Sequence, residues 1–353
     1  MKRRNLYISL GVAVLAGLAL ILILTNTTST LSRRYSEFAV EDTAAVTRIF
    51  MSDKNNNTLT LVRTGEDDWT VNDRYKGSRF NVTMLLQTMR DLEVSQPVAR
   101  AARNNIIRQM AANSVKVEIY QQVYRIRILG LRWFRHEKLT KVYYVGGATP
   151  SNRGSYFLME GSDEPYVVSL PGLRGFVTPR YMPIEKYWRD YTVIRRTLSE
   201  ITRVVVEIPA APDESFIVEN SRNGFTMLNA DGRTPAGGHV DTLAVLNFLN
   251  SFRNLNYEVL LNDLEQVRKD SILTLPPMIN LTVTDTAGVV VRIKTFRRPA
   301  EPGATDMNGK PLPYDMDRFY ALINDDSDLV IAQFFVFDRV LRPKSFFLRN
   351  ELK

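Results

Sequence analysis

The sequence lacks cysteine entirely, and only two of its 353 residues are histidine. Without thiols, the chain can form no disulfide scaffold, no iron–sulfur centre, no acylated lipoprotein anchor and few of the usual structural zinc sites. His136 lies in a basic run whose charge repels a metal cation, and His239 precedes Asp241, where a helix is expected to begin. We expect His239 to be an exposed loop or capping residue.

Motifs of the common hydrolases are also missing. The chain contains neither a Gly-x-Ser-x-Gly nucleophile elbow nor a His-Glu-x-x-His zinc motif. A hydrolase that uses two Asp or Glu side chains stays open as the least favoured alternative, since glycosidic chemistry needs only two carboxylates. We therefore predict a protein that is not an enzyme and that needs no cofactor and no metal.

One long uncharged apolar run is present, at residues 6–24, directly after Lys2, Arg3 and Arg4. As a helix, its nineteen residues would rise roughly 28 Å, close to the thickness of a bilayer core. Because basic flanks stay in the cytoplasm, this pattern predicts a membrane protein with a cytoplasmic N-terminus, a single span and an extracytoplasmic bulk. A cleaved signal peptide is the alternative, but no Ala-x-Ala site follows the run.

Excess charge is small. The net charge is +8, and the three basic residues before the apolar run leave +5 for the remainder. That modest value and the predicted compartment argue against nucleic acid as a partner.

Two stretches share one helical apolar pattern. Val82, Leu85, Leu86, Met89 and Leu92 are spaced as one face of a helix, and the same spacing recurs at Val245, Phe248, Leu249, Phe252 and Leu255. Similar strand patterns flank both stretches, with apolar residues at every second position. In these flanks we match Val115, Val117 and Ile119 to Ile279, Leu281 and Val283, and we match Ile126 and Ile128 to Val291 and Ile293.

The repeated order of elements predicts an internal duplication. We expect an α+β fold with an N-terminal transmembrane helix followed by two tandem copies of an antiparallel sheet-plus-helix module. The expected parts are a basic flank and anchor at 1–24, a spacer at 25–37, and repeats at 38–195 and 196–353. Residues 142–147 form a predicted strand of the first repeat, whereas Pro/Gly-rich residues 298–313 predict a loop in its place, as if the second repeat had lost that strand.

Several short motifs resemble a known family. They lie at residues 37–43, 49–53, 69–72, 143–147 and 166–172. Together they are similar to the bacterial envelope proteins grouped as domain of unknown function 4340, in the form common among Bacteroidetes-type bacteria. The resemblance covers nearly the whole chain, anchor included. It implies an anchored envelope protein without an established activity, and some family members accompany ABC transport systems associated with gliding motility.

Charged clusters provide the remaining candidates. The acidic stretch 324–328 offers oxygen ligands, but it lacks the spacing of a calcium loop, so we interpret it as a solvated turn. A basic segment interrupted by aromatic residues is the candidate interaction patch: Arg125, Arg127, Arg132, Trp133, Phe134, Arg135, Lys138 and Lys141. The cations have two interpretations, an ordinary solvated sheet face and a docking surface for anionic lipid, envelope polymer or an acidic protein. Trp133 and Phe134 either pack under the sheet edge or contact a partner.

These observations favour a non-catalytic interaction or accessory component of the envelope, and the family resemblance implies an ABC-type transport or gliding-related system. A binding module for an anionic envelope ligand, either polysaccharide or lipid head group, is the alternative. The expected partners are therefore the membrane, through residues 6–24, and an envelope protein or an anionic ligand.

Overall fold

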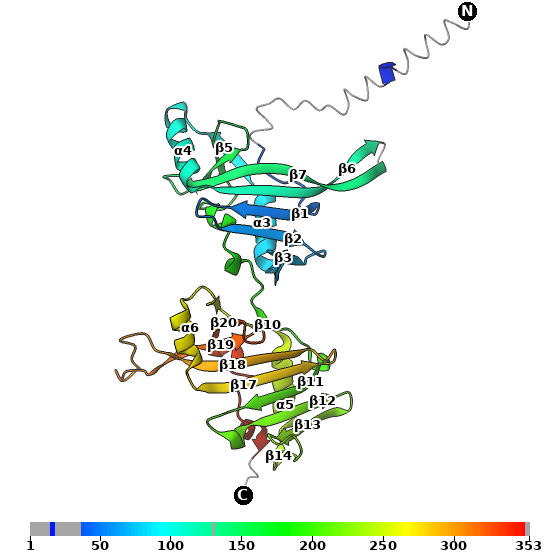
Figure 1. The fold of residues 1–353 in the computed structure, drawn as a ribbon, viewed down its shortest axis with the longest axis vertical. Helices are drawn as coiled ribbons and strands as arrows, with labels where there is room; N and C mark the ends of the chain where they lie inside the picture. The colour runs from blue at the N-terminus through cyan, green and yellow to red at the C-terminus, as the bar shows by residue number, and fades with distance from the viewer. Residues whose placement is uncertain (1–14, 18–36, 129–130, 350–353) are drawn as a thin grey trace, which may run out of the picture. The chain divides into compact units, whose positions relative to one another are not determined.

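The computed structural model describes residues 15–17, 37–128 and 131–349 (Figure 1). The predicted anchor at 6–24 lies outside these ranges, apart from the helical residues 15–17. Within the described ranges, no helix has the length and apolar character needed to cross a bilayer. The chain divides into two compact units between Asp190 and Tyr191, five residues before the boundary expected from the sequence.

The first unit is built on a nine-stranded antiparallel sheet in the order β4-β3-β2-β1-β6-β7-β8-β9-β5. Its strands are β1 (Val46–Ser52), β2 (Thr58–Arg63), β3 (Trp69–Val71), β4 (Tyr75–Lys76), β5 (Glu93–Pro97), β6 (Val115–Ile128), β7 (Leu131–Ala148), β8 (Ser155–Met159) and β9 (Tyr166–Ser169). Its helices are α3 (Arg79–Arg90), α4 (Arg100–Asn113) and the short 3-10 helices η1 (Thr178–Tyr181) and η2 (Glu185–Tyr187).

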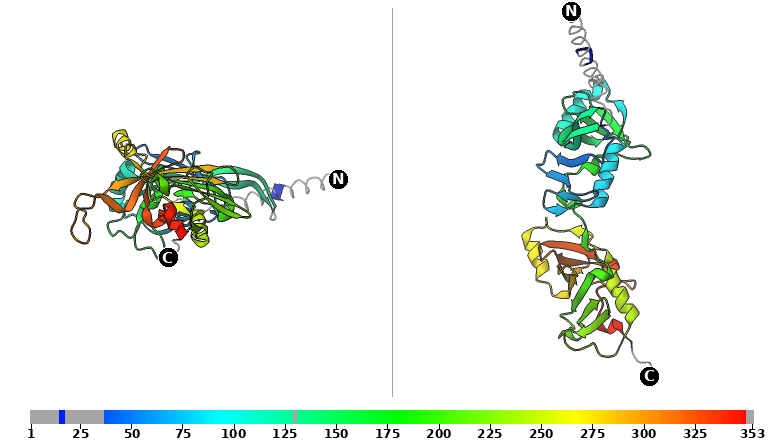
Figure 2. Two further views of the ribbon diagram at one scale, coloured as in Figure 1. Left: turned by 90° about the horizontal axis from the view of Figure 1, so that it is seen from below. Right: turned by 90° about the vertical axis from the view of Figure 1, so that its right-hand side faces the viewer.

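Helix α3 lies along one face of this sheet (Figure 2, right). It begins where the Ser78 side chain accepts a hydrogen bond from the Asn81 amide. Val82, Leu85 and Met89 are fully buried, which confirms the helical face predicted from their spacing. They join a core whose largest side chains are aromatic, with Phe38 packed edge-on against the rings of Tyr143 and Phe157.

The second unit is built on an eight-stranded antiparallel sheet in the order β13-β12-β11-β17-β18-β19-β20-β16. The strands of this sheet are β11 (Ile201–Glu207), β12 (Phe216–Ser221), β13 (Gly224–Asn229), β16 (Val259–Leu260), β17 (Pro277–Asp285), β18 (Val290–Pro299), β19 (Tyr314–Ile323) and β20 (Asp328–Gln333). Two further pairs lie outside it, β10 (Thr192–Ile194) with β15 (Leu255–Asn256) and β14 (His239–Val240) with β21 (Leu348–Arg349). The helices are α5 (Thr242–Asn250), α6 (Gln266–Leu273), α7 (Phe334–Phe337), η3 (Leu198–Glu200), η4 (Pro212–Glu214), η5 (Ser251–Arg253) and η6 (Lys344–Phe347).

The two main helices of this unit cover opposite faces of its sheet. Phe248 and Leu249 of α5 belong to the same buried cluster as Phe319 and Ala321 of β19. Ile272 of α6 instead packs with Leu322, the next residue along that strand. Because successive strand residues point to opposite faces, α5 and α6 must lie on different sides of the sheet.

The strand order agrees between the units. The eight strands of the second sheet follow one another in the chain as the corresponding strands of the first sheet do, and β4 has no counterpart in the second sheet. Strand β18 occupies the place of β7, so the prediction that the second unit lost the strand matching residues 142–147 is wrong. The Pro/Gly-rich stretch is the loop between β18 and β19.

The match of Ile126 and Ile128 to Val291 and Ile293 is also wrong. In the first sheet Val117 pairs with Tyr143, and in the second Leu281 pairs with Ile293. Ile293 of β18 therefore corresponds to Tyr143 of β7. Ile126 and Ile128 lie in a longer part of β6 to which β17 has no equivalent.

Candidate functional site

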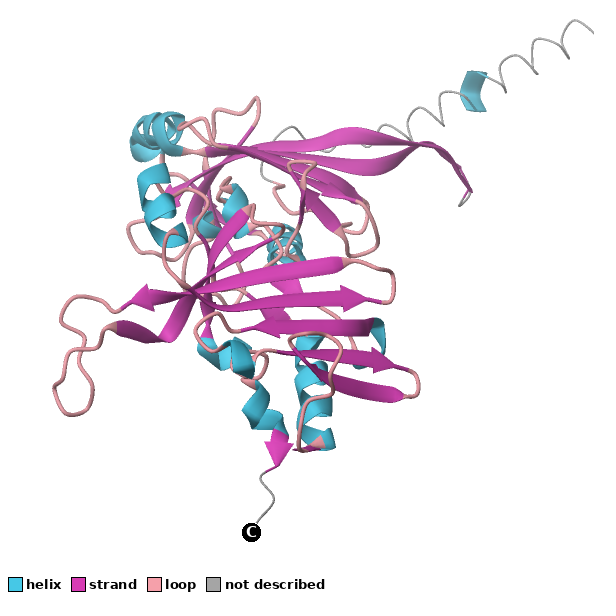
Figure 3. Ribbon diagram, turned by 60° about the horizontal axis from the view of Figure 1, so that its bottom comes forward, coloured by secondary structure: helices cyan, strands magenta, loops and turns pink. Residues whose placement is uncertain are grey.

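Strands β6 and β7 extend beyond the strands on either side of them. Strand β1 pairs with β6 only as far as Gln121, and β8 pairs with β7 only from Tyr143 to Ala148. Among the described residues, the sheet partners of residues 123–128 and 131–140, which we call the arm, all lie within β6 and β7. Figures 1 and 3 show this two-stranded ribbon projecting from the body of the first unit.

The arm carries most of the predicted interaction patch. Arg125, Arg135 and Lys138 are exposed, and the side chains of Arg127 and Arg132 lie outside the described residues. Trp133 and Phe134 are 50% and 69% exposed, so packing under the sheet edge, the blander of the two interpretations, is wrong for them. The structure thus places two aromatic and three cationic side chains of the patch on one projecting ribbon.

Lys141 has a different role at the root of the arm. Its ammonium is half-buried and donates a 2.6 Å hydrogen bond to the backbone oxygen of Glu37. Burial lowers the pKa of Lys141, although Glu37 and Glu41 oppose the shift. This residue joins the arm to the segment that enters the first unit, and we remove it from the exposed patch.

The arm's charges are not balanced within the first unit. Its one acidic residue, Glu137, accepts hydrogen bonds from the Arg48 guanidinium at 2.9 Å and the Thr47 hydroxyl at 2.6 Å, both on β1. Arg125, Arg135 and Lys138 form no ion pair with any residue in the described ranges. Direct pairing of Gln121 with Lys138 and of Tyr124 with Arg135 puts cations on both faces of the ribbon.

In the second unit, ion pairs neutralise three of the basic residues on strand β18. Arg292 and Lys294 form ion pairs with Asp325 and Asp326, and Arg298 contacts Asp315 and Glu301. The acidic stretch at 324–328 is a turn with left-handed backbone at Asn324, Asp325 and Asp326, which confirms the turn prediction. Among the described basic residues of β18, Arg297 is the exception, since it is exposed and lies over the Tyr314 ring.

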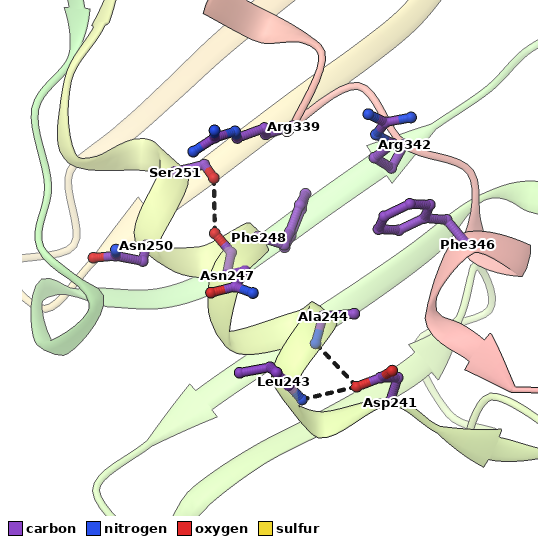
Figure 4. A pocket seen from close by; sticks show the side chains of 10 residues that line it. All are labelled: Asp241, Leu243, Ala244, Asn247, Phe248, Asn250, Ser251, Arg339, Arg342 and Phe346. Atoms are coloured by element: carbon purple, nitrogen blue, oxygen red, sulfur yellow. Dashed lines mark hydrogen bonds between the residues drawn. The ribbon is translucent and has the colours of Figure 1, made fainter.

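A groove of about 620 Å³ lies between α5 and the C-terminal segment of the second unit. Figure 4 shows Arg339, Arg342 and Phe346 opposite the helix residues Leu243 and Asn247. Sequence reasoning missed this site, because its two walls lie about 90 residues apart and only the exposed Phe346 beside buried Phe347 hinted at it.

Three polar side chains of the groove are already engaged. Asp241 caps α5 by accepting from the amides of Leu243 and Ala244, and the Ser251 hydroxyl donates to the Asn247 carbonyl. Arg342 pairs with Asp338. Among the described residues that line the groove, none forms a nucleophile–base pair.

A second hollow lies beside β19, and two of its carboxylates, Glu258 and Asp315, are held ionised. The Arg318 guanidinium contacts Glu258 at 2.8 Å and lowers the pKa of that carboxyl. Burial opposes the ionisation of Asp315, but hydrogen bonds from the Asp317 and Arg318 amides and from Arg298 outweigh it and lower its pKa. A glycosidase acid needs a raised pKa, so these groups do not support the hydrolase alternative.

The histidines do not assemble a site. The His136 ring lies 3.3 Å from the Phe134 carbonyl in the arm. His239 is exposed as expected, but it lies in strand β14, two residues before the α5 cap Asp241, so the prediction of a loop or capping role is wrong. Among the described residues no group of three or more His, Asp or Glu side chains is arranged to hold a metal ion. No protein-family model matches the chain, and no curated protein or solved structure matches it either.

Proposed function

We propose that this chain is a single-pass protein of a bacterial inner membrane that acts by binding and not by catalysis. The uncharged run at 6–24 and the basic residues before it support the anchor and its orientation. On this proposal the two units described above lie in the periplasm.

We further propose that the two units are tandem copies of one module. The shared strand order supports this, as does the position of one helix before and one after the edge strand of each sheet. The buried faces of α3 and α5, which follow the same spacing, add to it.

The interaction role rests on one observation, the arm. A ribbon that buries few of its own side chains and exposes Trp133 and Phe134 contributes little to a core, whereas exposed aromatic residues beside arginine are common at binding surfaces. The family resemblance in the sequence extends the proposal to an accessory role beside an ABC-type transport or gliding-related system.

Crosslinking in intact cells tests the interaction role. A photo-crosslinking residue is placed at Phe134 on the arm and, separately, at Leu243 in the groove, with Val267 on α6 as an equally exposed background position. We expect at least one of the first two positions to capture a membrane protein. Capture no greater than at Val267 from both positions would refute the accessory role.

A second candidate function is the binding of an anionic envelope ligand, polysaccharide or lipid. It is favoured by Arg125, Arg135 and Lys138, which are exposed and have no ion-pair partner in the part of the chain that the structure describes. Reversal of these three charges should abolish co-sedimentation of the protein with envelope material, and unchanged sedimentation would argue against this function.

A further inference from the structure

We infer that the arm docks on the anionic surface of the same bilayer that holds the N-terminal apolar run. This inference rests on the proposed anchoring of the chain. It names the arm's partner as phospholipid head groups of that membrane.

The first argument is reach. Lys141, at the root of the arm, bonds to Glu37, so the arm starts where the spacer joins the first unit. About twelve residues separate the apolar run from Glu37, and they span at most about 40 Å when fully extended. Along β7 the eight steps from Lys141 to Trp133 cover roughly 26 Å. The first unit is thus tethered close enough to the bilayer for its arm to touch the head groups.

The second argument is charge. Arg125, Arg135 and Lys138 are exposed and form no ion pair with any described residue, and Arg48 pairs with Glu137, the single carboxylate of the arm. Each cation close to an anionic lipid surface strengthens membrane association by about fivefold. A second copy of the chain is a poor occupant, because two arms would bring like charges together.

The third argument is the kind of apolar surface. Indole and phenyl rings favour the boundary between head groups and acyl chains, and the rings of Trp133 and Phe134 are exposed beside the cations. Leu139 adds exposed aliphatic surface next to them. Phe134 also has a left-handed backbone, with φ of 57°. A bulky residue rarely adopts that conformation, and such strain is concentrated at functional positions.

The tryptophans provide a direct test. Trp69 and Trp188 are buried in the first unit, at 3% and 5% exposure, so Trp133 is the one described tryptophan that lipid can reach. The full-length protein is reconstituted into vesicles of phosphatidylcholine, with or without phosphatidylglycerol, that contain brominated acyl chains. The fluorescence of Trp133 is the difference between the wild-type protein and Trp133→Phe. We expect bromolipid to quench at least half of it in the anionic vesicles, and far less in the neutral ones.

Charge-reversal variants identify the cause of quenching. The arm variant combines Arg125→Glu, Arg135→Glu and Lys138→Glu. Its matched control combines Arg108→Glu, Arg153→Glu and Arg174→Glu, which reverse three exposed cations elsewhere in the first unit. Quenching should fall severalfold in the arm variant and stay at the wild-type level in the control. Equal quenching in both variants would overturn the inference.

Failure of the inference and failure of the proposed function give different results. If bromolipid leaves Trp133 unquenched in anionic vesicles and a crosslinker at Phe134 captures a membrane protein, the arm binds protein. That result overturns the lipid inference and keeps the interaction role. If Trp133 is unquenched and neither crosslinking position captures a partner, both fall.

Discussion

Tyr143 and Tyr181 place two hydroxyl groups inside the core of the first unit, where both side chains are fully buried. The Tyr143 hydroxyl donates to the Tyr181 hydroxyl across 3.3 Å. Burial raises the pKa of both groups, so both stay neutral and act only as hydrogen-bond partners. Replacing either residue with phenylalanine removes one oxygen and keeps the ring.

The cost of each replacement follows from the partner left behind. Tyr143→Phe deprives the buried Tyr181 hydroxyl of this donor, and Tyr181→Phe deprives the Tyr143 hydroxyl of its acceptor. A buried polar group without its partner costs about 1–3 kcal/mol, and the long distance here favours the lower half of that range. Removing both hydroxyls leaves neither group unsatisfied, so the double variant should lose less than about 1 kcal/mol.

Tryptophan fluorescence during urea unfolding of the full-length protein measures these changes. All three tryptophans belong to the first unit, so the signal reports that unit and not the second. With a urea dependence of about 2 kcal/mol per molar, each single variant should lower the midpoint by about 0.5–1 M.

The double variant decides whether the two hydroxyls depend on each other. We expect its midpoint to lie closer to the wild-type value than that of either single variant. A loss equal to the sum of the two single losses would show that each hydroxyl is stabilised by something else, and the assignment of this bond would be wrong.

Three further predictions concern other parts of the fold. Asp241→Ala removes the cap of α5, which should cost the second unit about 1 kcal/mol and speed hydrogen exchange at the amides of Leu243 and Ala244; unchanged exchange would contradict the cap. Gly154→Ala should destabilise the first unit by about 1–3 kcal/mol, because its Cβ would lie 2.9 Å from the Val168 carbonyl oxygen. In the control Gly147→Ala, in the same hairpin, the new Cβ meets nothing within 4 Å, so the urea midpoint should change little. Burial opposes ionisation of Asp285, but hydrogen bonds from the Val289 amide and the Arg196 guanidinium lower its pKa. The stability that Asp285 contributes is therefore present above the unfolded-state pKa of about 3.9 and is lost as the pH falls through the lower folded-state pKa. Calorimetry at pH 7 and pH 3 should therefore show a smaller acid-induced loss in Asp285→Asn than in the wild-type protein, and an equal loss would contradict this assignment.

Much of the fold could be predicted because it depends on local periodicity. Spacing of 3.6 residues identified the buried faces of α3 and α5, since apolar residues that share a helical face share a neighbour. Alternation identified strands β6 and β17, and the composition of residues 324–328 identified a turn. In each case the interacting residues lie close together in the chain.

The register between distant strands could not be predicted in the same way. Alternation repeats every two residues, so a strand pattern matches another equally well after a shift along it. Ile126 and Ile128 were matched to Val291 and Ile293 for that reason, although the hairpin of β6 and β7 is longer than that of β17 and β18. The apparent loss of a strand from the second unit was a consequence of that shift.

The sequence alone determined the kinds of residues in the candidate patch, the absence of thiol chemistry, and the apolar run that implies an anchor. Tertiary structure alone decided which charges are free. Glu137 pairs with Arg48 across 89 residues, and Lys294 pairs with Asp326 across 32, so neutralisation depends on strands brought together by the fold. Because the arm extends beyond its neighbouring strands, Arg125, Arg135 and Lys138 meet no such partner among the described residues, and Trp133 and Phe134 stay exposed.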